Sequence, residues 1–522
     1  MPTYLSPGVY VEEVDRGSKP IEGVGTAVAA FVGFTETAPN DDPTDPNGVK
    51  PRLITNFSRF QELYGGFVDG ALLPHAVYGY FNNGGGACYI CRIPHTKGAT
   101  KTARRALTSG TKKEFETLHV TALEEGAPVE VIIEPGPAGE GEQSSNFTLK
   151  VNLGGNEVES FGDLTFGRGS RNVETVVNKE SKHVRVTALS APGMSVADRI
   201  PAAGRYSLEK GSASPVAVSG KDFEGSESNR TGIRGLVIAD EVTMVAAPDL
   251  VTAATRNGQL DLGLFKAVQT AMINHCENAG DRVAILDAPP GMSPQEVKEW
   301  REQTAMYDSK FAALYYPWIS VPNPNADNGN SSMLLPPSGH MAGIWARNDE
   351  TRGVWKAPAN EVVRGALDVE VKVTKGEQDL LNPMGVNCIR PFGLRGIRLW
   401  GARTLSSDPS WRYINVRRLF NFVEESILDG TQWVVFEPND MDLWARVRRT
   451  IYAFLLGLWR QGALFGATPA QAFYVKCDEE TNPPESVDEG KLVVEIGIAP
   501  VKPAEFVIFR ISQWQDGATT VE

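Results

Sequence analysis

Two cysteines stand three positions apart in Cys88-Tyr-Ile-Cys91, a spacing shared by zinc sites and redox motifs. Zinc requires a second pair of ligands, and none stands at a suitable spacing. A redox pair requires a helix N-terminus to lower the pKa of its thiols, whereas this motif lies in an apolar run that predicts a strand. We therefore predict two core cysteines. The six histidines are scattered and form no metal-ligand pair (His75, His95, His119, His183, His275 and His340).

Asp287 is the remaining candidate for catalysis. It ends an apolar run that predicts a buried strand, Val283–Asp287, and the carboxyl ends of such strands hold the catalytic residues of α/β enzymes. No Ser-His-Asp or paired-carboxylate partner can be placed from the sequence, so an ordinary strand-end turn is favoured. An α/β hydrolase-like enzyme with a site near Asp287 stays open as the alternative. Gly84-Gly-Gly86 lacks the Lys-Ser/Thr of a phosphate loop and predicts a helix stop, so no cofactor is expected.

The elements around these residues predict a mixed α/β (α+β) fold with several domains. Strands are expected at residues 26–34, 87–93, 236–239, 242–246, 283–287 and 312–316, with helices at 58–62, 72–82, 258–277 and 294–306 between or after them. Residues 99–231 contain short strands separated by turn residues and no clear amphipathic helix, which indicates an inserted β domain. The strongest helical patterns lie at residues 416–428 and 442–459, and strands are expected at 492–498 and 506–512.

These patterns divide the chain into five segments. We expect an N-terminal linker arm (1–20), a split α/β core domain (21–98 and 232–345), an inserted β-rich domain (99–231), a third, C-terminal domain (346–504) and a C-terminal arm strand (505–522).

Bulk composition excludes several function classes. The net charge of −13 over 522 residues argues against a general nucleic-acid binder. The longest strongly apolar run, residues 451–459, is too short to span a bilayer, and the first residues lack the pattern of a signal peptide. Five cysteines do not suggest a disulfide framework, so we expect folding in a reducing cytoplasm.

The two ends of the chain have strand composition without a local partner. Residues 9–14 follow a Pro-Gly pair and are separated from the first core segment by Gly17, Pro20, Gly23 and Gly25. A lone strand is unstable in water, so it must pair within its own chain or with a neighbour. The last predicted strand is apolar on both faces and must also be covered. The candidate arm residues are Val9, Tyr10, Val11, Glu12, Glu13, Val14, Phe506, Val507, Ile508, Phe509, Arg510 and Ile511.

Arginine is concentrated in residues 376–475, which hold eleven Arg and no Lys against nine acidic residues. Arg446, Arg448 and Arg449 begin the last long helix, and Arg417 and Arg418 begin the previous one. Arg is suited to fixed, bidentate pairing with carboxylates at interfaces. Ion pairs within the domain and a surface that docks on an acidic partner are both compatible with this pattern.

The chain resembles the tail sheath proteins of contractile phages and of bacterial contractile injection systems. The resemblance covers both ends and the α/β core, and it is weakest at residues 99–231. It is carried by the order of Tyr4-Leu-Ser-Pro-Gly-Val-Tyr-Val-Glu-Glu13, Ala30-Phe-Val-Gly-Phe34, Ile54-Thr-Asn-Phe-Ser-Arg-Phe60, Tyr64-Gly65, Tyr80-Phe-Asn-Asn-Gly-Gly-Gly86, Cys91-Arg92, Arg282-Val-Ala-Ile-Leu-Asp287, Pro336-Pro-Ser-Gly-His-Met-Ala-Gly343, Lys356-Ala-Pro-Ala-Asn360, Leu399-Trp-Gly-Ala-Arg403, Tyr413-Ile-Asn-Val-Arg-Arg418 and Pro503-Ala-Glu-Phe506.

The resemblance implies a structural, non-enzymatic protein that polymerises as stacked rings or a helix around an inner tube. It implies a metastable extended state that contracts and drives the tube through a target envelope. Partners would be further copies of the chain, the inner tube protein, and baseplate and terminal cap proteins, without nucleic acid or direct membrane insertion. The arms would add strands to the sheets of neighbours. The helix carrying Arg446, Arg448 and Arg449 would face the tube. Assembly would take place in the bacterial cytoplasm, as part of a phage tail or tail-like particle.

Overall fold

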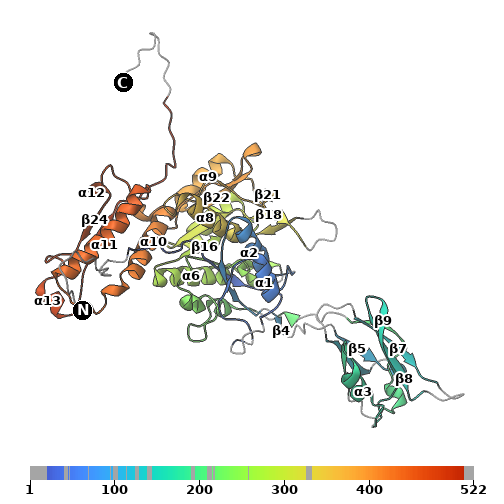
Figure 1. Cartoon of the computed structure of the whole chain (residues 1–522). Helices are drawn as coiled ribbons and strands as arrows, with labels where there is room; N and C mark the ends of the chain where they lie inside the picture. The colour runs from blue at the N-terminus through green and yellow to red at the C-terminus, as the bar shows by residue number, and fades with distance from the viewer. Residues whose placement is uncertain are drawn as a thin grey trace, which may run out of the picture. The chain divides into compact units, whose positions relative to one another are not determined.

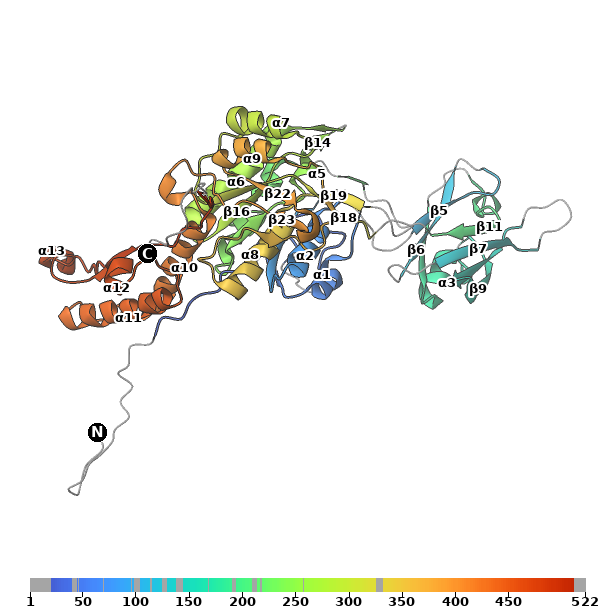
Figure 2. The same ribbon diagram turned by 90° about the horizontal axis from the view of Figure 1, so that it is seen from above.

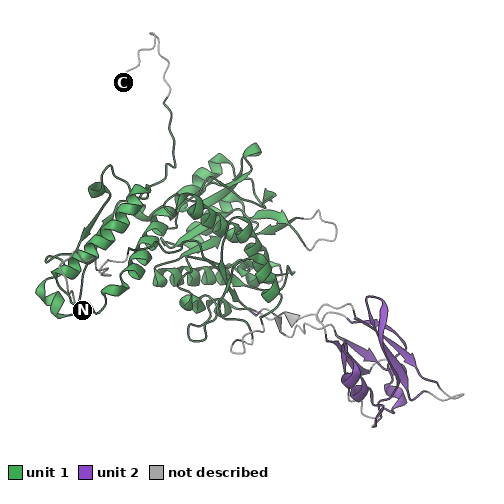
Figure 3. Ribbon diagram, viewed as in Figure 1, with its two compact units in different colours: residues 1–93, 218–522 green, residues 94–217 purple. Residues whose placement is uncertain are grey.

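The computed structural model describes residues 20–39, 45, 47–68, 70–94, 96–97, 104–112, 115–123, 129–137, 144–167, 169–189, 194–208, 214–215, 218–256, 258–324 and 332–510. The chain forms two compact units (Figure 3). Unit 1 comprises residues 1–93 and 218–522, and unit 2 comprises residues 94–217.

Unit 1 is built on a nine-stranded sheet with the order β2-β3-β1-β13-β16-β17-β22-β23-β20. The strands from β3 to β22 run parallel, and antiparallel strands close both edges. Parallel neighbours require crossover connections, which the helices between the strands supply. The strands are β1 (Ala29–Gly33), β2 (Arg52–Ile54), β3 (Cys88–Arg92), β13 (Met244–Ala246), β16 (Val283–Asp287), β17 (Ala312–Tyr316), β20 (Glu361–Val362), β22 (Val386–Pro391) and β23 (Ile397–Leu399).

Helices cover both faces of this sheet, as Figure 2 shows for α6 and α7 on one side and α2 and α8 on the other. Every residue of β1, β16 and β17 is buried, because a strand between two helical layers has no solvent face. Alternate residues of β1 enter the two separate apolar cores. The covering helices are α1 (Phe57–Tyr64), α2 (Leu73–Asn82), α6 (Leu262–Ala279), α7 (Pro294–Glu299), α8 (Ser338–Arg352) and α9 (Lys375–Leu381). The predicted α/β class is confirmed.

Two glycines allow α8 to pack closely on α2. A Cβ on Gly339 would lie 2.4 Å from the carbonyl oxygen of Ala76, and one on Gly343 would lie 2.4 Å from that of Tyr80. These distances are shorter than any normal carbon–oxygen contact, so only glycine permits this spacing. The spacing of four residues places both glycines on one face of α8.

The C-terminal part of unit 1 is an α+β subdomain with its own apolar core. Two long helices, α10 (Ile414–Gly430) and α11 (Met441–Arg460), pack with the two-stranded antiparallel sheet of β24 (Phe473–Lys476) and β25 (Glu495–Ile498). The short helices α12 (Pro469–Ala472) and α13 (Pro484–Asp488) lie before β24 and between the two strands (Figure 1). Leu443, Val447 and Ile451 form the start of the buried stripe of α11, as its periodicity predicts.

A buried ion pair fastens this subdomain to the sheet layer. The guanidinium of Arg418 on α10 donates to both carboxylate oxygens of Asp349 on α8, at 2.9 and 2.5 Å, and both side chains are almost fully buried. Thr26 adds a hydroxyl bond of 2.6 Å to the same carboxylate and accepts from Arg418 at its carbonyl. The guanidinium also lies 4.8 Å from the centre of the Trp345 ring. One charge pair therefore joins α8, α10 and the segment that precedes β1.

In the described part of unit 2, two antiparallel sheets and the helix α3 (Val173–Glu180) pack around a separate apolar core. One sheet has the order β10-β6-β5, with strands β5 (Arg104–Thr108), β6 (Glu116–Ala122) and β10 (Val184–Ala188). The other has the order β11-β7-β8-β9, with strands β7 (Val129–Pro135), β8 (Phe147–Leu153), β9 (Asn156–Leu164) and β11 (Gly204–Ser207). A short sheet pairs β4 (Thr96–Lys97) with β12 (Ser214–Pro215).

Four sequence expectations differ from the structure. The amphipathic helix α3 (Val173–Glu180) lies in unit 2, where no clear helix is predicted. Unit 2 spans 94–217 instead of 99–231, because Val218 and the fully buried Phe223 pack into the core of unit 1. Residues 236–239 belong largely to a 3-10 helix, Arg234–Ile238, instead of a strand. Residues 506–510 are not paired as a strand, since no described strand lies beside them. The rest of the predicted domain division stays a prediction.

Candidate interaction surfaces

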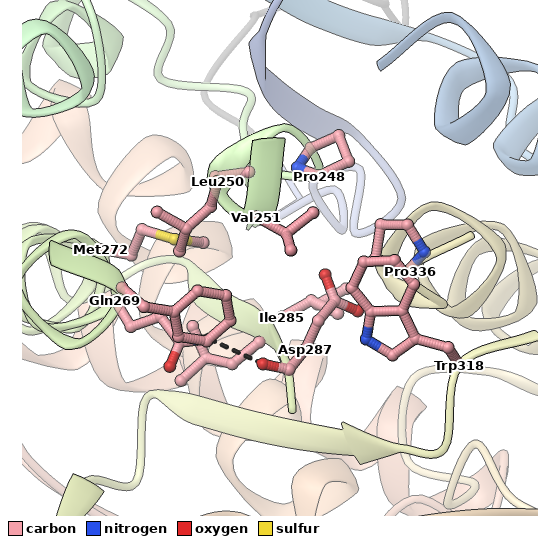
Figure 4. Close-up of a pocket in the computed structure, with 12 residues that line it drawn as sticks. Pro248, Leu250, Val251, Gln269, Met272, Ile285, Asp287, Trp318 and Pro336 are labelled. Atoms are coloured by element: carbon pink, nitrogen blue, oxygen red, sulfur yellow. Dashed lines mark hydrogen bonds between the residues drawn. The ribbon is translucent and has the colours of Figure 1, made fainter. Parts of the chain in front are cut away.

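Asp287 is the last residue of β16, and its side chain lies beside the pocket shown in Figure 4. Its Oδ1 accepts a 2.8 Å hydrogen bond from the backbone N–H of Ser338, the first residue of α8. Its backbone carbonyl accepts from Gln269, whose own side-chain oxygen accepts from Tyr307. Burial raises the pKa of Asp287 to about 7. The carboxyl group therefore satisfies the N-terminus of a buried helix.

The pocket beside Asp287 has about 10 Å³ of free space. This is roughly the room that one water molecule requires. Apolar side chains form most of its walls, among them Leu250, Val251, Met272, Ile285 and Trp318 (Figure 4). A substrate cannot reach the carboxyl group in this geometry, so the hydrolase-like alternative has no structural support.

The two cysteines of the C-x-x-C motif are buried, as predicted. Cys91 belongs to the apolar core on one face of the sheet and Cys88 to the core on the other. Burial raises the pKa of both thiols above the ordinary value, which disfavours the thiolate required for redox chemistry or metal binding.

The arginines of α11 and α10 fall into two groups. Arg446 pairs with Glu437 at 3.2 Å and lies over the Trp433 ring. Arg448 donates to the backbone carbonyl of Cys477, and Arg449 is exposed. All three lie within the first three turns of α11. Arg417 and Arg418 are buried, and both are held by partners inside unit 1. The structure thus leaves the α11 group as the exposed one.

The predicted arms are described only in part. Val9, Tyr10, Val11, Glu12, Glu13, Val14 and Ile511 lie outside the described residues. The segment from 506 to 510 has no helix or strand structure, and all five of its residues are exposed. The exposed fractions of its apolar side chains are 71% for Phe506, 68% for Val507, 77% for Ile508 and 83% for Phe509. Four consecutive exposed apolar side chains are typical of a surface that a partner covers.

Glu505 anchors this segment to unit 1, a role that the sequence does not reveal. One carboxylate oxygen accepts from Asn382 at 2.7 Å and from Arg403 at 2.8 Å, and the other accepts from Arg403 at 2.6 Å and from Tyr413 at 3.0 Å. Burial raises the pKa of Glu505, but the hydrogen bonds from Arg403 and Asn382 outweigh it and keep the pKa below its ordinary value. The one sequence feature that could have indicated this anchor is a single acidic residue at the start of an apolar run. The chain is therefore fixed up to Glu505 and exposed from Phe506 to Arg510.

The sheet of β24 and β25 has two open edges. These strands pair only with each other among the described strands. A two-stranded sheet is marginally stable in water, and unpaired edges are templates for a further strand. The core of the α+β subdomain supports this sheet from one side through Phe473, Val475 and Ile496.

Comparison with known proteins gives a consistent family assignment. The model of the phage tail sheath protein central domain matches residues 247–405, and that of the phage tail sheath C-terminal domain matches residues 406–513. A putative prophage major tail sheath protein of Pseudomonas aeruginosa (strain UCBPP-PA14) is 29% identical over 324 residues, which cover 60% of this chain and 78% of the relative. The tail sheath protein of Burkholderia phage BcepMu is 23% identical over 520 residues, which cover 95% of this chain and 94% of the relative.

Solved structures share the fold over almost the whole chain. The helical sheath of the anti-feeding prophage (AFP) in its contracted state matches with a TM-score of 0.58 and 24% identity, covering 98% of this chain and all of the other. The PVC sheath complex of an extracellular contractile injection system, also contracted, matches with a TM-score of 0.57 and 24% identity, covering 99% of each chain.

Proposed function

Because this chain belongs to the phage tail sheath family, we propose that it polymerises around an inner tube and contracts to drive that tube through a target envelope. The protein is a structural subunit of a contractile tail sheath. One observation carries the proposal: an apolar segment, residues 506–509, lies exposed directly after a firmly anchored residue, Glu505. An isolated subunit gains nothing from such a segment, whereas a polymer can bury it.

We propose that the arms at the two ends of the chain join neighbouring subunits by β-strand addition. We propose the sheet of β24 and β25 as an acceptor, because both of its edges are open among the described strands. A donated strand would form about four to six backbone hydrogen bonds of roughly 0.5–1.5 kcal/mol net each, in addition to apolar burial. Links of this strength keep neighbours connected while their rigid bodies rotate.

Contacts with the inner tube, by contrast, have to release during contraction. Exposed pairs between arginine and carboxylate contribute about 0–1 kcal/mol each, which suits a reversible contact. We propose that Arg446, Arg448 and Arg449 supply it. The linked lattice would make the transition from the metastable extended state cooperative, since each subunit moves with its neighbours.

The proposed partners are further copies of the chain, the inner tube protein, and baseplate and terminal cap proteins. AFP baseplate structures contain a chain with this fold, which favours a place for the protein at the baseplate as well as along the sheath. We propose that the subunit is made and assembled in the bacterial cytoplasm. No helix in the described ranges is long and apolar enough to cross a bilayer. We assign no catalytic role.

Negative-stain microscopy of the chain, expressed with its cognate inner tube protein, tests this function. We expect long striated tubes whose diameter exceeds that of the bare inner tube. Bare inner tubes beside monomeric subunits, under conditions in which both proteins are folded, would contradict the proposal.

The α11 arginines provide a separate prediction about the tube. Changing Arg446, Arg448 and Arg449 together to glutamate is expected to reduce the amount of sheath on tubes by at least about tenfold, because the change reverses three charges in the first half of one helix. The fold is expected to persist, since none of the three is buried. Cosedimentation with preformed tubes measures the effect, with Arg256→Glu as the control on another exposed site. Unchanged cosedimentation would place the tube contact on a different face.

A further inference from the structure

A wide basic cleft lies beside the anchored C-terminal segment. It has a volume of about 1130 Å³, and its walls include the end of α8, helix α9 and the residues from Val501 to Val507. Small-molecule sites span about 300–1,000 Å³, so this cleft is large enough for a protruding segment of another protein. The indole rings of Trp355 and Trp400 belong to its lining.

The lining of the cleft carries a positive charge that unit 1 does not neutralise. It includes six basic residues and two acidic ones, namely Arg352, Lys356, Lys375, Arg390, Arg403 and Lys502 against Asp379 and Glu505. Arg403 is paired with Glu505 and Lys356 with Glu361, but the other four basic residues have no carboxylate partner within the described part of the chain.

Arg390 has a further unmet requirement. One of its terminal nitrogens donates to the Gln378 side chain at 2.8 Å, whereas its buried Nε has no hydrogen-bond partner among the described residues. A guanidinium that has no carboxylate partner favours an incoming acidic group. The cleft is therefore suited to a partner that carries carboxylates.

The chain itself carries such a partner at the opposite end of α11. The connection between β24 and β25, residues 478–489, holds six acidic residues: Asp478, Glu479, Glu480, Glu485, Asp488 and Glu489. Glu480 and Glu489 pair with nearby lysines. Glu479, Glu485 and Asp488 are exposed and form no ion pair within the described ranges. We call this segment the acidic connection.

The acidic connection is held in a fixed shape. The buried Asn482 donates from its side chain to the carbonyl of Val493 at 3.0 Å and accepts from the N–H of Val493 at 2.6 Å. It lies near the start of α11, where Asn439 donates to the carbonyl of Lys491. Gln461 and Gly462, just after the end of α11, line the cleft. A helix of 20 residues is about 30 Å long, so the two charged surfaces are too far apart to meet within one copy.

We propose that the acidic connection of one copy docks in the basic cleft of a second copy. Two different, complementary surfaces at opposite ends of one helix produce a head-to-tail contact, which builds rings or open helical polymers instead of closed dimers. Glu479, Glu485 and Asp488 would meet Arg352, Lys375, Arg390 and Lys502. The proposal rests on the proposed function, because it takes the polymer as given and assigns a contact within it.

A charge-swap experiment on full-length protein tests the contact. Arg352→Glu with Lys375→Glu reverses the cleft, and Glu485→Lys with Asp488→Lys reverses the acidic connection. Each double variant alone is expected to reduce the sheath formed with the tube protein by at least about tenfold, because like charges would then face each other. The chain that carries all four changes is expected to regain sheath to within about twofold of the unmodified protein. Pelleted sheath and tube lengths in micrographs measure both effects.

The outcomes separate this inference from the proposed function. Arg256→Glu with Lys266→Glu is the matched control: Arg256 lies shortly before α6 and Lys266 lies on α6, neither lines the cleft, and the variant is expected to assemble normally. The docking proposal would be overturned if either double variant formed normal sheaths. It would also be overturned if the chain with all four changes formed no more sheath than the double variants. Both outcomes leave the proposed sheath function intact. Absence of sheaths from the unmodified chain would overturn the function itself. Circular dichroism spectra of all variants show that they are folded.

Discussion

Replacing Asp349 with alanine is expected to lower the free energy of unfolding of unit 1 by about 3–5 kcal/mol, because it leaves the charge of Arg418 buried without a partner. The Arg418 side chain is 3% exposed, so water cannot replace the lost carboxylate. The change also removes the acceptor of the Thr26 hydroxyl. The same variant therefore loosens α8, α10 and the segment before β1 together.

Denaturant unfolding followed by tryptophan fluorescence measures this effect in unit 1 alone. All ten tryptophans lie outside residues 94–217, so unit 2 contributes no signal. Asp368→Ala is the matched control, because Asp368 pairs with Lys372 at the surface, where the two side chains are 51% and 70% exposed. That control is expected to change stability by at most about 1 kcal/mol.

A second variant distinguishes the buried charge from simple loss of packing. Asp349→Leu combined with Arg418→Met removes both charges while keeping most of the volume, and it is expected to be more stable than Asp349→Ala. If the double variant were as unstable as the single one, packing would explain the loss and the ion pair would not. Equal effects of Asp349→Ala and Asp368→Ala would contradict the role given to the pair.

Strands buried on both faces were predictable from the sequence, whereas the conformation of the exposed C-terminal segment was not. β16 and β17 match their predicted bounds, because a short run of apolar residues between turn signals has few alternatives inside a parallel sheet. Residues 506–509 have an equally apolar sequence, yet they are exposed. Their composition predicts a strand correctly only if a sheet is available, and one subunit does not offer it to them. Local sequence records the preference of a segment but not the location of its partner.

Charged residues show the same limit. Arg417 and Arg418 stand side by side, as do Arg448 and Arg449, and the sequence gives both pairs equal weight as surface candidates. The structure buries the first pair, because the partner of Arg418 lies 69 residues away on α8. The role of Glu505 as an anchor likewise depends on its hydrogen bond with Arg403, which is 102 residues away in the sequence. Such contacts follow from how the helices pack on the sheet. The spacing of residues along the chain does not reveal that packing.

Ending the chain at Glu505 is expected to abolish sheath formation while leaving the subunit folded. The exposed segment after Glu505 forms no described hydrogen bond or ion pair with the body, so its removal is expected to shift the thermal unfolding midpoint by less than about 2 °C. In a polymer, by contrast, the deletion would remove about four to six backbone hydrogen bonds and the burial of four apolar side chains per subunit. Burying one such side chain contributes about 1.5–3 kcal/mol. A loss of this size at every link leaves no stable lattice.

The point of truncation decides what the experiment measures. A chain that ends at Gln513 keeps the whole apolar segment and is expected to form sheaths, so it controls for the loss of the last residues. A chain that ends at Glu505 keeps the anchor of Arg403, Asn382 and Tyr413, although it loses Phe506 and Val507 from the wall of the cleft. Light scattering and negative-stain micrographs, with the tube protein present, compare the two chains.

These outcomes locate the link between subunits. If the chain ending at Glu505 is monomeric and the chain ending at Gln513 forms sheaths, residues 506–513 hold neighbours together. If both form normal sheaths, the C-terminal arm has no part in assembly, and the exposure of Phe506 and Phe509 would require another partner. Because the anchor is present in both chains, its loss cannot explain a difference between them. The fixed Glu505 and the exposed segment after it would then be two halves of one device: the first sets where the arm leaves its own subunit, and the second binds the next.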